Sequence, residues 1–322
     1  MPTAAGTAAG TVAREVTRRW AELDPLLPEP PQVAGCGTRL AVPAAADGSL
    51  AAAGTCEHWT APAGSLDATW GAACRFELRP QIAAADVRAA LDQLLAQWAG
   101  HLSGLPAAAQ DDTAAVVTWP SRDIEGVRAL LDHGLVPRSV IAARLPGRGP
   151  RPRTAALPSG VHIRQAGPAD ARAVVQLGLE TIRYDACFGT VIERPDTVPA
   201  LRVEAGAALA GPDPWIWLAE RDARPVGLLY AERPESSGWI APLARPAPVS
   251  YLELMTVRPE ERGSGVGAAL VAEFLRIAEA AGVGVTLLHH DQANPLSGPF
   301  WSQRGYRPLW TVWEARPART LR

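Results

Sequence analysis

The sequence predicts a mixed α/β protein of the α+β type, in which two tandem domains each have a curved mixed sheet flanked by helices. Three observations lead to this prediction. The chain has 322 residues, which is enough for two ordinary domains. Residues 146–159 are rich in proline, glycine and arginine, a composition typical of a linker, and separate domains at 1–145 and 160–322. Strand-like and helix-like segments alternate steadily after that linker.

Each element of the second half follows from a local pattern. Runs rich in β-branched, aromatic and leucine residues predict strands at 161–165, 215–221, 225–233, 250–257, 283–290 and 308–316. Apolar residues at helical spacing predict helices at 169–183, within 196–210, at 265–282 and at 295–306. A short turn at 222–224 joins two of the strands, and Gly282 ends the third helix.

The first half repeats the second in a degraded form. Residues 78–95 align without gaps on 257–274, and residues 115–137 align on 286–308. Two segments in the same order indicate a duplicated fold unit. Chance similarity between two alanine-rich helices is the alternative explanation.

Composition excludes several function classes. The formal net charge is −2, and all 31 basic residues are arginine. Without lysine there is no phosphate-loop lysine, no Schiff-base lysine and no kinase ATP lysine. Neither half has the basic excess of a nucleic-acid binder, and no apolar run is long enough to span a membrane. The N-terminus does not resemble a signal peptide, so we expect a cytoplasmic protein. The four cysteines lack metal-site spacing, so we expect no metal ion.

A glycine-rich loop carries the strongest chemical signal. The segment Arg262-Gly263-Ser264-Gly265-Val266-Gly267 connects a strand that ends at Val257 to the start of a helix. Glycines let a ligand approach the backbone, and the first N–H groups of a helix attract an anion. The loop therefore favours a diphosphate, although a tight strand–helix turn needs similar glycines.

This loop resembles the acyl-CoA-binding motif of the GNAT superfamily (GCN5-related N-acetyltransferases). A later GNAT signature is also present, as Asn294, Ser297, Trp301, Gly305 and Tyr306. The resemblance covers about residues 160–317 and implies an acyltransferase whose co-substrate is acetyl-CoA or another acyl-CoA. A dinucleotide-binding site is excluded, because the required glycine spacing and the following acidic residue are missing.

The resemblance also implies which residues hold the acyl-CoA. They are Leu254, Met255, Thr256, Val257, Arg262, Gly263, Ser264, Gly265, Val266, Gly267, Ala268, Asn294, Ser297 and Trp301. The pantetheine arm is expected to lie like an extra strand between 250–257 and 283–290, with a β-bulge aiming an N–H, that of Met255, at the thioester oxygen. In the first half Ala83, Ala84, Asp86 and Arg88 replace the loop residues, so we expect no acyl-CoA site there.

Glu253 is the expected general base, with Tyr251 and His289 as further catalytic candidates. A glutamate paired with an arginine on the sheet is the alternative for Glu253. Trp301 stands at the family's usual tyrosine position and cannot act as an acid, and Tyr306 is expected in the core. Candidate substrate contacts are Arg183, Tyr184, Asp185, Tyr230 and Glu232; a solvated loop is the alternative for the first three.

These features predict an acyl-CoA-dependent N-acyltransferase in which a primary amine of a small molecule or peptide attacks the thioester directly. Two alternatives stay open: a non-catalytic acyl-CoA-binding protein, and an acyltransferase that uses a longer-chain or carrier-bound acyl donor. We expect no nucleic-acid or membrane partner, and a homodimer is compatible with the sequence.

Overall fold

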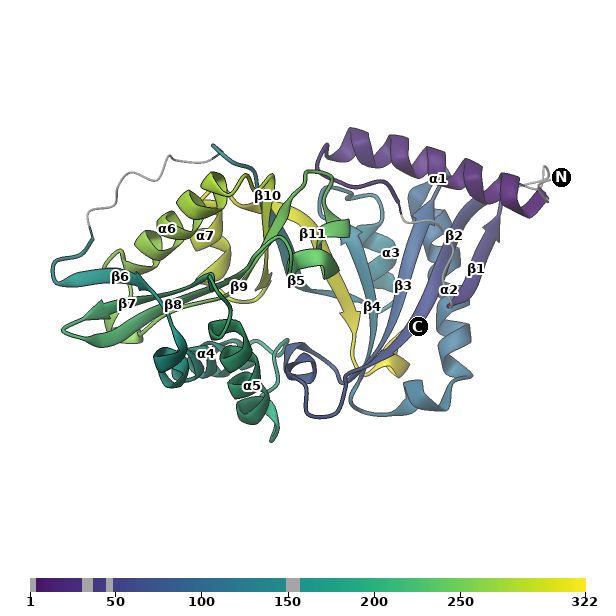
Figure 1. Ribbon diagram of the computed structural model, residues 1–322. Helices are drawn as coiled ribbons and strands as arrows, with labels where there is room; N and C mark the ends of the chain where they lie inside the picture. The colour runs from purple at the N-terminus through teal and green to yellow at the C-terminus, as the bar shows by residue number, and fades with distance from the viewer. Residues whose placement is uncertain (1–3, 31–36, 45–48, 149–156) are drawn as a thin grey trace. The chain divides into compact units, whose positions relative to one another are not determined.

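The computed structural model describes residues 4–30, 37–44, 49–148 and 157–322 (Figure 1). The chain divides into two compact units. The first unit contains residues 1–61, 72–140 and 308–322, and the second contains residues 62–71 and 141–307. Each unit therefore includes one segment from the other half of the chain.

The first unit is a mixed sheet with helices on both faces. Its strands, in spatial order, are β1 (Thr38–Pro43), β2 (Leu50–Thr60), β3 (Cys74–Ile82), β4 (Thr113–Pro120), β11 (Arg307–Ala315) and the first part of β5 (Val136–Arg144). Its helices are α1 (Ala4–Leu23), α2 (Val87–Ser103) and α3 (Val127–Asp132). The β3–β4 pair is parallel, whereas β1–β2, β2–β3 and β4–β11 are antiparallel.

Alternation along β2 places α1 and α2 on opposite faces of this sheet. Ala52 belongs to the large hydrophobic cluster with Leu91 and Leu94 of α2. The adjacent Ala53 packs instead with Val12 and Val16 of α1. Successive side chains of a strand point to opposite faces, which accounts for both contacts.

The strands of the second unit have α4 and α5 on one face and α6 and α7 on the other (Figure 1). Its strands, in spatial order, are the end of β5, β10 (Val285–Asp291), β9 (Val249–Val257), β8 (Arg224–Glu232), β7 (Ile216–Arg221) and β6 (Val161–Gln165). Its helices are α4 (Ala171–Ala186), α5 (Thr197–Leu209), α6 (Val266–Ala280) and α7 (Ser297–Ser302). The β9–β10 pair is parallel, and the pairs β6–β7, β7–β8 and β8–β9 are antiparallel.

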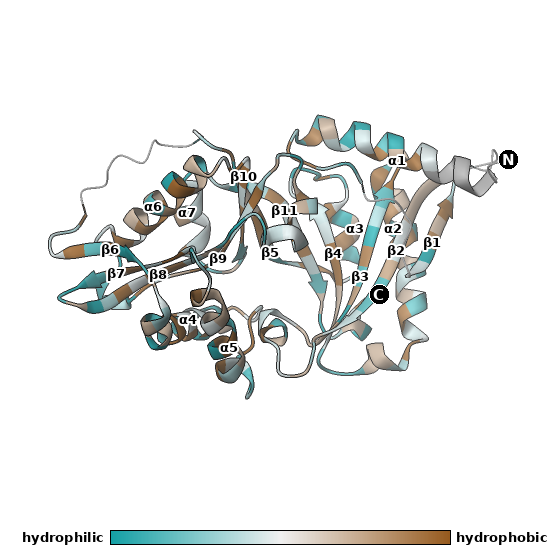
Figure 2. Ribbon diagram, in the orientation of Figure 1, coloured by the Kyte–Doolittle hydropathy of each residue, from teal (hydrophilic) through white to brown (hydrophobic). Residues whose placement is uncertain are grey.

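Hydrophobic residues hold these layers together. The strands of the second unit are brown along much of their length in Figure 2. Between these strands and α4 and α5 lies a cluster that includes Leu177, Leu201, Ile216 and Leu228. The β7–β8 hairpin closes on Asp222 and Ala223, which have φ values of 50° and 58°. Positive φ at both central residues is typical of the two-residue turn that matches strand twist.

The compact units differ from the predicted domains at residues 62–71, 141–145 and 308–322. The predicted last strand of the second domain is β11, which pairs with β4 from Trp310↔Pro120 to Ala315↔Ala115 and places Trp313 in the first unit's core. Residues 62–71, which connect β2 to β3, belong to the second unit because Leu66 is buried in its hydrophobic cluster. The centre of the predicted linker, residues 149–156, lies outside the described residues.

From β1 and from β7 onward, the two halves of the chain have the same order of elements: three strands, a helix, a strand, a helix and a strand. Helices α2 and α6 begin at Val87 and Val266, and strands β5 and β11 begin at Val136 and Arg307. These positions reproduce the two alignment offsets in the sequence, 179 and 171 residues. The origin of the first half as a decayed copy stays a prediction.

Candidate functional site

The loop before α6 is shaped by two glycines in the left-handed region. Gly263 has φ of 77°, and Gly265, the residue before the helix, has φ of 100°. Residues with a Cβ rarely adopt such angles, and a Cβ on Gly263 would meet no atom within 4 Å. The first backbone hydrogen bond of α6 runs from the N–H of Ala269 to Gly265 O. The N–H groups of Val266, Gly267 and Ala268 precede it and form the electropositive end of the helix.

Gly267 serves packing. A Cβ there would lie 3.3 Å from both the Phe300 ring and the Val257 side chain, so glycine lets α6 approach β9 and α7. Ser264 Oγ donates a hydrogen bond to Glu261 O at 2.6 Å, which tightens the loop. At Gly267 the structure agrees with the alternative that the sequence left open, a glycine needed for close strand–helix packing.

Arg262 is tied to the end of β9 and to α4. Its Nε donates to Val257 O at 3.1 Å, and its guanidinium lies 4.8 Å from the centre of the Tyr184 ring. Tyr184 also makes an edge contact with Phe188 at 5.3 Å. Arg262 was predicted to bind the co-substrate and Tyr184 to bind the acceptor. The two side chains are in contact with each other.

The parallel pair β9–β10 ends part-way along both strands. Its register runs from Val249↔Val285 to Leu252↔Leu288, and β9 then continues to Val257 paired with β8. The residues predicted to bind pantetheine, Leu254, Met255, Thr256 and Val257, all lie in this second stretch. Along it, the edge of β9 that faces β10 has no strand partner among the described residues.

A β-bulge at Glu253 lies where the two strands part. Tyr230 pairs with Leu254 and Ala231 pairs with Leu252, so Glu253 is the extra residue on β9. A bulge re-aims a side chain and interrupts the ladder. A bulge in this strand was predicted, and the structure puts it at Glu253.

Acidic and phenolic groups surround the Glu253 carboxyl. Burial raises its pKa well above the ordinary value, and a hydrogen bond with Glu204 of α5 and the charge of Glu232 raise this pKa further. A hydrogen bond with Tyr230 acts in the opposite direction and lowers the pKa of Glu253. The arginine pairing considered as an alternative is not among these interactions. A carboxyl beside another carboxyl retains a proton that an isolated glutamate would lose.

An aromatic cluster lies beside these acids and consists of Tyr251, His289 and Trp239. Tyr251 and His289 are joined by a 3.0 Å hydrogen bond between the phenol oxygen and Nδ1. Trp239, whose exposed fraction is 58%, contacts the Tyr251 ring edge-on at 4.9 Å and donates its indole N–H to Glu232 at 2.9 Å. Burial raises the pKa values of Tyr230, Tyr251 and Glu232, so the phenols stay protonated in the neutral range.

Asn294 both caps α7 and contacts Asp185. Its side-chain oxygen accepts hydrogen bonds from the N–H groups of Leu296 at 3.0 Å and Ser297 at 3.3 Å. Its side-chain nitrogen donates to Asp185 at 3.0 Å. Burial raises the pKa of Asp185 to about 6, against the effect of this hydrogen bond. These bonds agree with the helix-cap alternative for Asn294, although the residue directly before α7 is Leu296.

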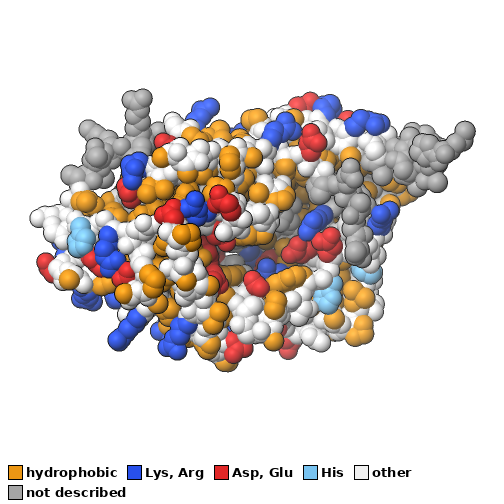
Figure 3. All heavy atoms as spheres, in the orientation of Figure 1, with side chains coloured by type: hydrophobic (Ala, Val, Ile, Leu, Met, Phe, Trp, Pro, Cys, Tyr) orange, Lys and Arg blue, Asp and Glu red, His pale blue; other side chains and the backbone are white. Residues whose placement is uncertain are grey.

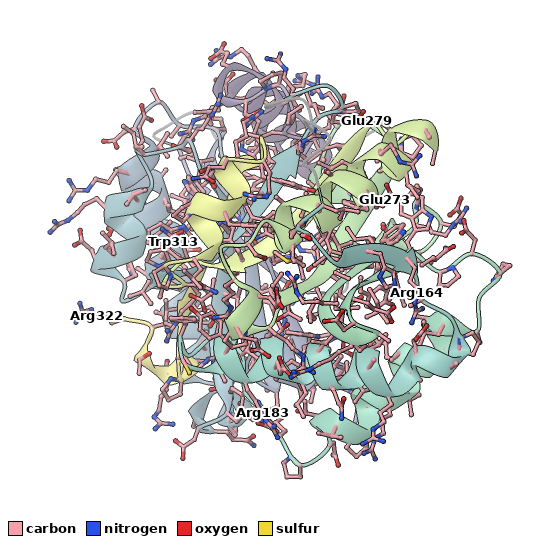
Figure 4. All side chains as sticks on the ribbon, turned by 90° about the vertical axis from the view of Figure 1, so that its left-hand side faces the viewer. Arg164, Arg183, Glu273, Glu279, Trp313 and Arg322 are labelled. Atoms are coloured by element: carbon pink, nitrogen blue, oxygen red, sulfur yellow. The ribbon has the colours of Figure 1, made fainter. Side chains whose placement is uncertain are left out.

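Arg183 belongs to an exposed ion pair. It lies on α4, on the opposite side of the sheet from Glu273 and Glu279 of α6 (Figure 4). Its guanidinium binds both carboxylate oxygens of Glu193, with a closest approach of 2.9 Å. The solvated-loop alternative describes this pair better than a substrate contact does.

Trp301 and Tyr306 pack in the interior. Trp301 is 6% exposed and contacts the rings of Phe300 and Tyr306 edge-on. The Tyr306 hydroxyl accepts a hydrogen bond from Thr286 at 3.0 Å, and burial raises its pKa to about 12. The prediction that Tyr306 belongs to the core is confirmed.

The corresponding helix end of the first half is filled by its own side chain. Asp86 precedes α2 and accepts a hydrogen bond from the N–H of Ala89 at 3.0 Å. The N–H groups of Ala83 and Ala84 are bonded to Ala51 O at 2.9 and 3.0 Å. A carboxylate that already binds the helix N-terminus competes with an anion for that place.

Sequence reasoning missed Glu204 and Trp239. Glu204 is an acid among small residues on a short helix, and Trp239 is in the Pro-rich segment 234–248. A tryptophan in a polar loop is the signal that could have drawn attention to Trp239.

The described residues show neither a surface patch of one charge on the face in Figure 3 nor a cluster of metal ligands. Arginine and acidic side chains are interspersed over the face shown in Figure 3. The described part of the chain has no group of three or more His, Cys, Asp or Glu side chains placed to hold a metal ion. None of its helices combines the length and apolarity needed to cross a bilayer.

Comparison by sequence gives two matches. Residues 183–306 match the model of the acetyltransferase (GNAT) family. A mycothiol acetyltransferase of Frankia alni is 33% identical over 92 residues, which make up 27% of this chain and 28% of that protein. The match therefore spans less than a third of that relative's length.

Two solved structures share the fold over most of the chain. The GCN5-related N-acetyltransferase from Sphaerobacter thermophilus has a TM-score of 0.55 at 19% identity, covering 94% of this chain and 85% of that one. A GNAT-family acetyltransferase from Colwellia psychrerythraea has a TM-score of 0.51 at 11% identity, covering 94% and 95%. The predicted fold class, a mixed sheet flanked by helices, is confirmed. Together with the family match, which includes the β8–β10 site, these findings show that the chain contains a domain of the acetyltransferase (GNAT) family within residues 183–306.

Proposed function

We propose that the second unit is an acyl-CoA-dependent N-acyltransferase, with acetyl-CoA as the donor, that acylates a primary amine of a small molecule or peptide. The observation that carries this proposal is the position of Glu253. Its carboxyl is on a bulge where β9 and β10 part, next to Glu204, Glu232 and Tyr230. A carboxyl at that point can take a proton from an ammonium group that is about to react.

The residues present fit an acyl-CoA. The open, positive-φ turn at Gly263 and Gly265 and the first N–H groups of α6 suit a diphosphate, and the free edge of β9 suits an extended amide chain. The donor supplies an acyl group activated as a thioester: a new C–N bond forms, the C–S bond breaks, and the thiol leaves with a proton. We assign the N–H of Met255, two residues beyond the bulge, to the thioester oxygen.

The acceptor side attracts cations. Three carboxyl groups, those of Glu204, Glu232 and Glu253, lie together, and Trp239 exposes an aromatic face beside them. An ammonium ion gains from both kinds of group, since carboxylates attract its charge and an indole ring attracts cations through its π-face. We therefore expect an amine that is protonated in solution and loses its proton to Glu253 in the site.

The proton for the leaving thiol needs a different donor from the family's usual tyrosine. Trp301 is buried and its indole does not ionise near neutrality, and the Tyr306 hydroxyl is bonded to Thr286. Tyr251 and His289, joined by their hydrogen bond, are the pair we propose for proton transfer to and from solvent.

Thiol release with a panel of amines tests the proposal. Acetyl-CoA and longer acyl-CoA donors are each incubated with monoamines, diamines, amino sugars and peptides, and free CoA thiol is measured against Glu253→Gln. We expect amine-dependent release that the variant loses by at least about a hundredfold, the lower range for a positioned acid–base group. Tight acyl-CoA binding without release for any amine would instead favour a non-catalytic binding protein, the alternative to which Trp301 points.

A further inference from the structure

A ten-residue segment of the first half lies in the second unit. Residues 62–71, here called the strap, connect β2 to β3 and include the short 3-10 helix Leu66–Trp70. Strands β2 and β3 are antiparallel neighbours with Thr60 opposite Cys74, so a shorter turn could join them. The strap therefore has a role other than closing this hairpin.

Hydrophobic burial anchors the strap beside α4 and α5. Leu66 is 5% exposed and belongs to the cluster that contains Val191 and Leu201. Trp70 packs against the same cluster and is partly buried, as is Tyr230 of the site. Burial of Leu66 removes apolar surface from water and favours the docked position of the strap.

Three hydrogen bonds connect the strap to the loop between α4 and α5. The N–H of Ile192 donates to Thr69 O at 2.8 Å. The Arg194 guanidinium donates to Ala68 O at 2.6 Å and to Gly71 O at 3.1 Å. The strap thus satisfies backbone and side-chain groups of a loop that has no regular structure of its own.

A buried threonine pair extends this connection to α5. The hydroxyls of Thr69 and Thr197 are 2.8 Å apart, and each residue is 1% exposed. Thr197 Oγ1 also accepts a hydrogen bond from the N–H of Arg194 at 2.8 Å. Because Thr197 is the first residue of α5, the strap fixes both the start of this helix and the loop before it.

Helix α5 contacts the strap at its first residue and contacts the Glu253 carboxyl further along. Glu204 follows Thr197 by seven residues, so the two lie on the same face of the helix, two turns apart. Glu204 is the residue whose carboxyl is hydrogen-bonded to Glu253. A shift at the start of α5 is transmitted along a rigid helix to this contact.

We propose that the strap is a positioning element for the acceptor side of the site: it holds the 187–196 loop and α5 so that Glu204 stays against Glu253. The inference rests on the proposed function for its catalytic consequence, and it gives the first half of the chain a part in the reaction. Thr69 is the central positioning residue, because its carbonyl and its hydroxyl bind the loop and the helix separately.

The test compares Thr69→Val with Thr69→Ser. Valine keeps the shape and removes the hydroxyl, whereas serine keeps the hydroxyl. Thr113→Val is the matched control, since Thr113 is also a buried threonine with hydrogen bonds to backbone groups but lies in the first unit. Arg194→Ala is a second variant, at a half-buried position, that removes the guanidinium hydrogen bonds to Ala68 O and Gly71 O.

Hydrogen exchange is the readout that needs no activity. In Thr69→Val and Arg194→Ala we expect amide exchange in 188–196 to speed up by about three- to tenfold, the equivalent of one net hydrogen bond. Thr69→Ser and Thr113→Val should exchange as the wild type does in this segment. Unchanged exchange in both loosened variants, or equal acceleration in Thr113→Val, would overturn the proposal.

Kinetics supply the second readout. Separation of Glu204 from Glu253 should lower the pH midpoint of kcat/KM and raise KM for the amine more than it lowers kcat, with recovery in Thr69→Ser. Faster exchange with an unmoved pH midpoint would refute the link to Glu204. If the wild type releases no thiol with any amine, the proposed function fails, while the exchange result still decides whether the strap holds the loop.

Discussion

Replacement of Glu204 by glutamine tests the electrostatic structure of the site directly. In the wild type, burial, Glu204 and Glu232 together raise the pKa of Glu253, so this base becomes ionised only at a pH well above 4.5. Because the amine must give its proton to ionised Glu253, we expect kcat/KM to rise with pH along an acidic limb set by this pKa. Glu204→Gln removes one carboxyl and puts an amide donor beside Glu253, which favours the ionised form.

The repulsion between the Glu204 and Glu253 carboxylates determines how far the acidic limb of kcat/KM moves. Two unit charges about 4 Å apart in an effective dielectric constant of about 20 repel each other by about 4 kcal/mol. Glu204 is half-buried, so solvent screens part of this repulsion. We therefore expect the acidic limb to move to lower pH, by less than the unscreened repulsion would give.

The assay is the pH profile of kcat/KM for the best amine, measured beside Glu180→Gln. Glu180 is a half-buried helix glutamate of the same unit whose carboxylate pairs with Arg258 at 2.9 Å, so this variant changes charge without touching the carboxyl cluster. An acidic limb that stays in place in Glu204→Gln, or that moves equally in Glu180→Gln, would show that Glu253 does not set the profile.

The raised pKa of Glu253 also makes the stability of the folded protein depend on pH, which gives an independent test. The folded protein holds a proton on Glu253 that the unfolded chain releases near its ordinary pKa of 4.5. Its contribution to stability is therefore present below pH 4.5 and is lost as pH rises through the raised folded value. In Glu204→Gln this loss should be smaller, which thermal unfolding at a series of pH values measures.

Three further predictions concern other parts of the site. Gly265→Asp should weaken acyl-CoA binding at least about tenfold in calorimetry, whereas Gly282→Asp, with comparable strain at φ of 74° beyond the other end of α6, should leave it unchanged; equal losses would refute the diphosphate assignment. Trp239→Ala should raise KM for a cationic amine by about two- to tenfold with no change in acyl-CoA affinity, and an unchanged KM would remove the indole from the acceptor site. Because the pKa of Asp185 is raised from 3.8 to about 6, the wild type should lose stability as pH rises through this range. Asp185→Asn should remove this loss, so its free energy of unfolding should depend less on pH; the same pH dependence in both proteins would contradict the raised pKa.

Local patterns predicted the elements of the second unit well. The predicted helix 265–282 is α6, Val266–Ala280, because Gly265 and Gly282 both adopt positive φ and end the helical pattern on either side. The predicted turn at 222–224 is the β7–β8 turn. In each case the cause is short-range, and a window of a few residues contains it.

The division into units depended on long-range pairing that such windows do not contain. Strand β11 is strand-like by composition, but composition does not specify which sheet edge it pairs with. Its equivalent in the first half, β5, has the same length, so the local signals of the two strands are interchangeable. The strap has no periodic pattern at all, and its place in the second unit depends mainly on one leucine and two threonine hydroxyls.

The site shows the same division between local and long-range causes. Spacing placed Glu253, Tyr251 and His289 on adjacent strands of one sheet, so their proximity could be predicted. The character of Glu253 could not, because it depends on Glu204, 49 positions earlier on a helix packed over the sheet. A glutamate beside an arginine would be ionised and a poor proton acceptor, whereas one beside a second carboxyl has a pKa shifted toward that of its substrate. Since the strap fixes the start of that helix, the basicity of the proposed general base depends on residues that the sequence assigns to the other half of the chain.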